Sequence, residues 1–156
     1  MTRLSRLATA LLLAASLNAF AADSAPAPAA ADPLATARAL IADNKWVAAI
    51  EELKRVDARD SADWNNLMGY SHRKAKVPDY AAAERYYDAA LAINPTHRGA
   101  LEYSGELFLM KGELPRAEQR LAALDKACFL PCSEYTDLKN AIAKFKANGN
   151  RVAAQN

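Results

Sequence analysis

The chain contains few of the residues from which catalytic and metal sites are built. It holds only two histidines and two cysteines in 156 residues, and no His-x-His or Cys-x-x-Cys group occurs. No metal site is therefore predicted. The five glycines are dispersed, which excludes a phosphate-binding glycine loop. His72 stands near the end of a predicted helix and His97 follows Pro95, where a histidine is usually solvated or packed locally. We expect neither an enzyme nor a cofactor.

An apolar run of membrane-spanning length is also missing. Leu7 to Leu17 form a short apolar stretch behind Arg3 and Arg6, and Ala19-Phe20-Ala21 follows as a small-x-small cleavage site. This order is typical of a secretory signal peptide, here residues 1–21, while an uncleaved anchor is the alternative. We expect a periplasmic or secreted protein of a bacterial envelope, with no membrane insertion after the signal is cleaved.

Neither sign of charge is in excess once the leader is removed. The chain has 20 Lys and Arg against 18 Asp and Glu, and the leader contributes two arginines and no acid. The basicity therefore belongs to the targeting signal and gives no reason to expect a nucleic-acid partner. Residues 22–33 are rich in Ala and Pro and are predicted to be a linker. Residues 34–148 form the predicted domain, and residues 149–156 a flexible tail.

A period of 34 residues is the strongest pattern in the domain. Within each copy the periodic residues stand at offsets 0, 3, 7 and 10, which lie on one face of a helix. A second helical segment lies between successive copies, and β-hairpin signals are absent, so the fold is predicted to be all-α. The four columns are Trp46, Tyr80 and Leu114; Ala49, Ala83 and Ala117; Leu53, Tyr87 and Leu121; and Val56, Ala90 and Leu124.

These features resemble the tetratricopeptide repeat (TPR) family, whose unit is a helix–turn–helix of 34 residues. Gly105, Phe108 and Gly112 match the family pattern in the third copy, whereas Gly69 and Gly105 are 36 residues apart, two more than the period. The resemblance implies a TPR-type α-solenoid with repeats at about 34–60, 61–95 and 96–128. A C-terminal capping helix over 133–148 would close it, with Ser133 as the N-cap.

The resemblance also implies a binding groove. In TPR proteins the opening helices of successive repeats line a concave surface that holds peptides. Glu102 and Glu106 have the wrong sign for the family's two-cation carboxylate clamp, so a segment with basic residues or an extended polar peptide fits equally well. The run 72–76 can instead be read as cations that cap a helix C-terminus. The implied groove residues are Asn66, Tyr70, Arg73, Lys74, Glu102, Glu106 and Met110.

Most aromatic residues, among them Tyr103, are expected in the repeat core rather than in a base-stacking or sugar-binding platform. Tyr70 and Tyr86 are least explained by the core.

Cys128 and Cys132 flank a predicted turn at Pro131. A disulfide is favoured in an exported chain, although the nearby helix N-terminus would also suit a reactive thiol. The leading functional hypothesis is a non-catalytic protein-interaction module or scaffold that binds a protein or peptide partner. The alternative is a thiol-redox or metal-handling envelope protein that uses both cysteines. A third hypothesis, an accessory of a peptidoglycan-linked or outer-membrane complex, differs from the first only in its partner.

Overall fold

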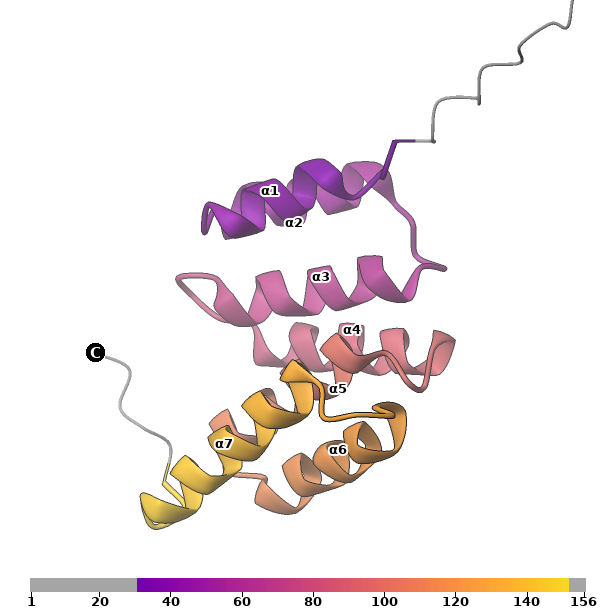
Figure 1. Cartoon of the computed structure of the whole chain (residues 1–156). Helices are drawn as coiled ribbons and strands as arrows, with labels where there is room; N and C mark the ends of the chain where they lie inside the picture. Colours follow the sequence, from indigo (N-terminus) through magenta and orange to yellow (C-terminus); the bar gives the residue numbers. More distant parts are fainter. Residues whose placement is uncertain (1–30, 152–156) are drawn as a thin grey trace, which may run out of the picture. The chain divides into compact units, whose positions relative to one another are not determined.

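The computed structural model describes residues 31–151, which form seven α-helices and no strand. The predicted signal peptide, most of the predicted linker and residues 152–156 lie outside the described part. Successive helices pack as antiparallel pairs, and the pairs stack in chain order (Figure 1), as in a helical repeat or solenoid. The prediction of an all-α fold is thus confirmed. The helices are α1 (Ala35–Ala42), α2 (Trp46–Val56), α3 (Ala62–Lys74), α4 (Tyr80–Ile93), α5 (Arg98–Met110), α6 (Leu114–Ala127) and α7 (Ser133–Ala147).

Side chains in the loops define where several helices begin. The backbone N–H of Trp64 donates to the Ser61 hydroxyl, and that of Ala82 donates to the Asp79 carboxylate, so α3 and α4 have side-chain caps. The prediction that Ser133 caps the last helix is wrong. Cys132 is the N-cap of α7 in an extended conformation, and Ser133 is already helical and donates to Glu134.

The odd-numbered helices form one continuous layer. Each helix packs on the next, and in addition α1 contacts α3, α3 contacts α5, and α5 contacts α7. No comparable backbone contact joins α2, α4 and α6 to one another within residues 31–151. Side chains bridge α4 and α6 instead, since Arg116 and Arg120 of α6 bind Glu84 and Asp88 of α4. Residues of α3, α5 and α7 can therefore share one surface.

Small residues in the repeat columns let the two layers approach closely. Ala49, Ala83 and Ala117 fall at equivalent places in α2, α4 and α6, and all three are fully buried. The core consists of three apolar clusters that follow one another along the stack. One helix pair cannot bury its own apolar face, so each cluster needs the neighbouring pair.

Two helical glycines mark the closest approaches. A Cβ atom on Gly69 in α3 would lie 2.8 Å from ring carbons of Tyr87 and 3.1 Å from the Ala83 carbonyl oxygen in α4. A Cβ atom on Gly105 in α5 would lie 2.5 Å from a methyl carbon of the buried Leu138 in α7. The two extra residues between these glycines lie in the loop 75–79, which is longer than the loops 43–45 and 111–113.

One surface network connects the starts of three odd-numbered helices. Asp63 at the start of α3 binds Arg38 of α1 at 2.9 Å and His97, which precedes α5, at 2.8 Å. The Nδ1 atom of His97 accepts the N–H of Ala100, so its Nε2–H must donate to Asp63. The hydrogen bond from His97, together with Arg38, holds the pKa of Asp63 below its ordinary value.

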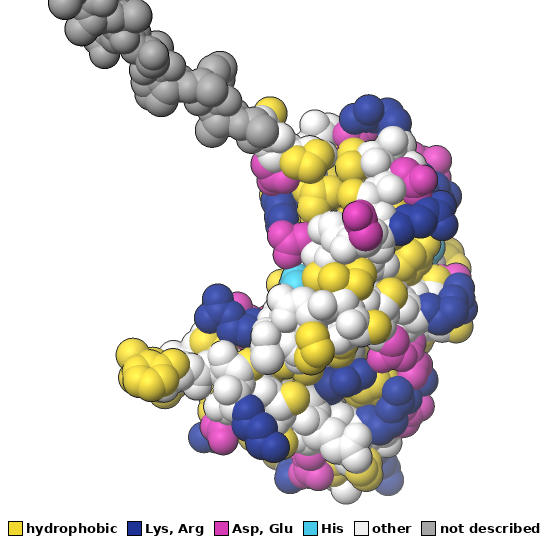
Figure 2. All heavy atoms as spheres, turned by 90° about the vertical axis from the view of Figure 1, so that its right-hand side faces the viewer, with side chains coloured by type: hydrophobic (Ala, Val, Ile, Leu, Met, Phe, Trp, Pro, Cys, Tyr) yellow, Lys and Arg dark blue, Asp and Glu magenta, His cyan; other side chains and the backbone are white. Residues whose placement is uncertain are grey.

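Charges of both signs are mixed on the surface. Figure 2 shows lysine and arginine side chains interspersed with aspartate and glutamate over the face that it presents, which is hollowed at one edge. A group of hydrophobic side chains stands out from the same face. Among residues 31–151, no helix is both long and apolar enough to cross a lipid bilayer.

Gly69 gives a direct test of the close packing. Replacing it with alanine raises helix propensity by about 1 kcal/mol, but the added methyl group meets a buried ring and a backbone carbonyl. We expect Gly69→Ala to reduce the free energy of unfolding by roughly 1–3 kcal/mol, measured by urea denaturation. An unchanged or higher urea midpoint would show that α3 and α4 do not approach as closely as described.

Candidate functional site

A groove of about 550 Å³ lies between the C-terminal half of α3 and α5, with α7 along one side. It is large enough for a few side chains of a ligand. Six of the seven residues implied by the TPR resemblance line it, and Asn66 does not. The lining residues are Tyr70, Arg73, Lys74, Glu102, Tyr103, Glu106, Leu109, Met110 and Ala141.

Asn66 is a packing residue rather than a groove residue. It is buried, and its Nδ2 atom would lie 3.1 Å from a Cβ atom on Gly99, so it fills the space beside the first turn of α5. Its Oδ1 atom has no hydrogen-bond partner within the described residues. The groove therefore begins one helical turn further along α3, at Tyr70.

Arg73 is a buried cation at the base of the groove. Its residue is only 5% exposed, and its Nη1 atom lies 2.7 Å from Glu106 Oε2. The guanidinium also lies 5.4 Å and 5.5 Å from the ring centroids of Tyr70 and Tyr103. Burial favours the neutral form, but Tyr87 and Glu106 outweigh it and keep the pKa of Arg73 above its ordinary value. The charge of Arg73 is therefore compensated by its ion-pair partner, Glu106.

Two tyrosines form an aromatic wall over Arg73. The rings of Tyr70 and Tyr103 are 4.6 Å apart between centroids, and Trp46 packs edge-on to Tyr70 at 5.8 Å. Tyr103 was expected in the core with most of the other aromatic residues. It is instead only half-buried and lines the groove. Burial, with Glu102 adding to it, raises the pKa of Tyr103 to about 12.

Glu102 is a buried carboxylate without a cation. The residue is 8% exposed and lines the groove, yet within residues 31–151 it makes no ion pair or hydrogen bond through its side chain. Burial raises the pKa of Glu102 to about 7, and repulsion from Glu106, Asp137 and Glu134 adds to this effect. Arg73 opposes the shift but is paired with Glu106. Such a carboxyl group changes its charge near neutral pH.

The basic residues at the end of α3 have two roles: some pack against neighbouring side chains, and others line the groove. His72 stacks on Tyr86 with ring centroids 5.5 Å apart, on the other side of α3 from the groove residues. Burial lowers the pKa of His72. Lys74 lines the groove, is exposed, and makes no ion pair with another described residue. The last turn of α3 thus supplies one buried and one free cation to the groove.

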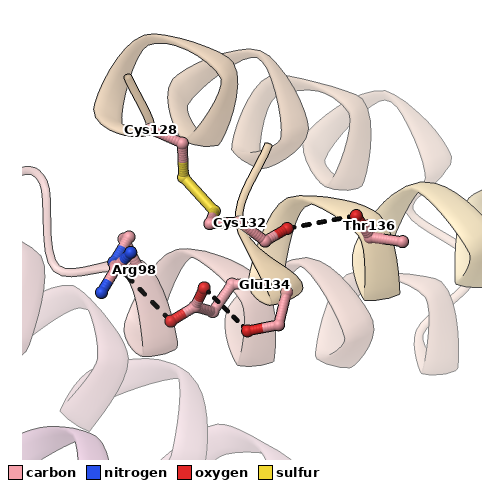
Figure 3. Close-up of a disulfide and its surroundings, with 6 residues drawn as sticks. Arg98, Cys128, Cys132, Glu134 and Thr136 are labelled. Carbon is pink, nitrogen blue, oxygen red and sulfur yellow. Dashed lines mark hydrogen bonds and ion pairs between the residues drawn. A yellow bond between two sulfur atoms is a disulfide. The ribbon is translucent and has the colours of Figure 1, made fainter. Parts of the chain in front are cut away.

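Cys128 and Cys132 form a disulfide across the turn between α6 and α7, with Cα atoms 6.0 Å apart (Figure 3). Cys128 is the C-cap of α6 and Cys132 the N-cap of α7. Two residues further on, Glu134 faces Arg98 of α5 at 3.6 Å. The closed loop holds Phe129 fully exposed to solvent. The disulfide thus fixes where α7 starts on α5.

The lining residues can bind charged and aromatic groups, since they combine two carboxylates, two cations and two tyrosine rings. Within residues 31–151, no three His, Cys, Asp or Glu side chains are grouped as metal ligands would be. Comparisons of the chain with protein-family models, with curated proteins and with solved structures found no match.

The disulfide is expected to stabilise the fold modestly. Because it closes a loop of only five residues, the chain-entropy model gives about 2 kcal/mol. The double variant Cys128→Ser/Cys132→Ser should lose this amount in urea denaturation, and the wild-type protein with a reducing agent should match it. If the double variant is as stable as the oxidised protein, the disulfide does not hold α7 in place.

The two groove glutamates are expected to affect stability with opposite signs. Because the pKa of Glu102 is raised, the folded state favours the protonated carboxyl group. The contribution of Glu102 to stability is therefore fully present below pH 4.5 and is lost as the pH rises through about 7. At pH 8, Glu102→Gln should therefore stabilise the protein by roughly 1–3 kcal/mol, and at pH 4 it should have little effect. Glu106→Gln removes the partner of the buried Arg73 and should cost roughly 2–4 kcal/mol.

Urea denaturation of both variants between pH 4 and pH 8 checks this prediction. A Glu102→Gln variant less stable than the wild type at pH 8 would show that Glu102 has a stabilising partner.

Proposed function

We propose that this protein is a non-catalytic interaction module of the TPR type, located in a bacterial envelope, whose groove binds an extended segment of a partner protein. The stack of sequential helix pairs and the 34-residue period of its columns support the TPR assignment. Fold alone does not define function, so the proposal depends on the groove.

The observation that carries the proposal is the convergence of side chains from separate helices on one open groove. Tyr70 and Lys74 of α3, Glu102 and Met110 of α5, and Ala141 of α7 line the same space. A solenoid whose only task was to bury its core would not require an uncompensated carboxylate and an unpaired lysine in the same groove. Unpaired charged side chains are typical of binding sites, where residues kept for function often lower the stability of the fold.

The chemistry of the groove suits a peptide better than a small apolar ligand. Its walls are charged and aromatic, and apolar contact is limited mainly to Leu109, Met110 and Ala141. A partner segment that runs along the layer of odd-numbered helices would meet Lys74 at the end of α3 and Glu102 in the first half of α5. It would also contact the exposed parts of Tyr70 and Tyr103.

An envelope location has separate support. Residues 1–21 have the pattern of a secretory signal, and a disulfide is compatible with an oxidising compartment. The position of Cys132 at the start of α7 also keeps thiol chemistry as a second candidate function, because a helix N-terminus lowers a thiol pKa. The two sulfurs lie near Arg98 and Thr96, whereas the groove lies along the later turns of α5.

Site-specific photocrosslinking in the envelope tests the proposal. A photoreactive amino acid at Met110, on the rim of the groove, should give a discrete crosslinked partner. The photoreactive amino acid placed at Gln119, which is exposed on α6, is the matched control and should give no crosslinked partner. A third position, Phe129, samples the exposed disulfide loop. If crosslinks form at Phe129 or Gln119 but not at Met110, the groove is not the binding surface.

A further inference from the structure

Among the described residues of the groove, Glu102 is the one charged group that is more than nine-tenths buried and has no ion-pair partner. Arg73, which is also buried, is compensated by Glu106 at 2.7 Å. Lys74 is exposed and can be solvated. A buried carboxylate without a cation or hydrogen-bond donor is unfavourable unless it is protonated or a ligand supplies the missing charge.

We propose that the groove recognises a basic side chain of the partner segment, a lysine or an arginine, whose cation binds the Glu102 carboxylate beside the ring of Tyr103. This inference rests on the proposed function and specifies what that function recognises. The cation would compensate the Glu102 carboxylate, and a cation–π contact with the ring of Tyr103 would strengthen the binding further.

The charges around Glu102 exclude the other classes of side chain. From α5 it faces Glu106, from α7 it faces Glu134 and Asp137, and from α3 it faces Arg73. Arg73, the one positive charge in this set, pairs with Glu106, and Arg98 of α5 pairs with Glu134. Lys74, the unpaired cation of the groove, stands at the end of α3 and is not among the charges that act on Glu102. An acidic ligand group would be repelled by three carboxylates, and a neutral group would leave Glu102 uncompensated.

The same charges make recognition dependent on pH. A proton and a basic side chain compete for Glu102, so only the deprotonated protein binds the cation. With a pKa of about 7 for Glu102, the deprotonated fraction falls about tenfold between pH 8 and pH 6. The affinity for a lysine-containing segment should fall by the same factor over this range, whereas lysine itself stays charged throughout.

The test starts from a random peptide library selected for binding to the exported full-length protein at pH 8. Peptides that bind in the groove should share one lysine or arginine position. Replacing this residue with norleucine, which has a similar shape and no charge, should weaken binding at least tenfold. Spermidine, as a free polyamine, should bind more weakly than the peptide, because it lacks the segment that fills the rest of the groove.

Two variants separate recognition from folding. In Glu102→Gln the lysine and norleucine peptides should bind within about twofold of each other, and the pH dependence should disappear. Because this variant is expected to be more stable than the wild type, its loss of preference cannot be attributed to unfolding. Glu118→Gln is the matched control, since Glu118 is a surface glutamate on α6 that pairs with Lys146, and it should keep the tenfold preference.

The outcomes distinguish this inference from the proposed function. Peptides that crosslink to Met110 but bind equally with lysine or norleucine would overturn the inference and leave the groove proposal standing. Equal binding of spermidine would show that a free cation, not a segment, is recognised. If no selected peptide contacts the groove, both proposals are wrong.

Discussion

The groove depends on how closely the helices approach at two glycines. Gly69 leaves room for the ring of Tyr87, and Gly105 leaves room for Leu138, which brings α3 onto α4 and α7 onto α5. With a side chain at either position the helices would have to separate. Arg73, Glu106 and the two tyrosines project from α3 and α5, which contact each other and both pack on α4. The glycines thus help to hold the two helices that carry the site against their neighbours.

Two charged residues of the groove are less than one-tenth exposed, and of these Arg73 has an ion-pair partner and Glu102 does not. Arg73 and Glu106 form a pair in which removal of either member would leave a charge in a poorly solvated place. Glu102 is one helical turn away on the same helix and has no such partner within the described residues. A neutral glutamine would fit the same space with less repulsion. A deprotonated glutamate there is expected to lower stability, and the basic side chain of the proposed partner segment would compensate its charge.

Much of the fold could be predicted from the sequence, because a period of 34 residues determines which positions are equivalent in each repeat. The fold class and the buried alanines at 49, 83 and 117 follow from that period. The groove could be predicted only in part. The residues of the four periodic columns lie in α2, α4 and α6, so the period does not show which face of α5 carries Tyr103, and Tyr103 was expected in the core although it lines the groove. Asn66 was expected in the groove but is buried, because Gly99 at the start of α5 leaves space for its side chain.

The contribution of α7 could not be predicted from the repeat, because this helix lies outside it. As a cap, α7 covers the apolar end of the stack with Leu138, Ile142 and Phe145. It also supplies Ala141 to the groove, and Glu134 and Asp137 to the negative field at Glu102. Because Cys132 is the N-cap of α7, the disulfide fixes the helix two residues before Glu134. The covalent link at the end of the fold and the protonation of the groove carboxylate are thus physically connected through α7.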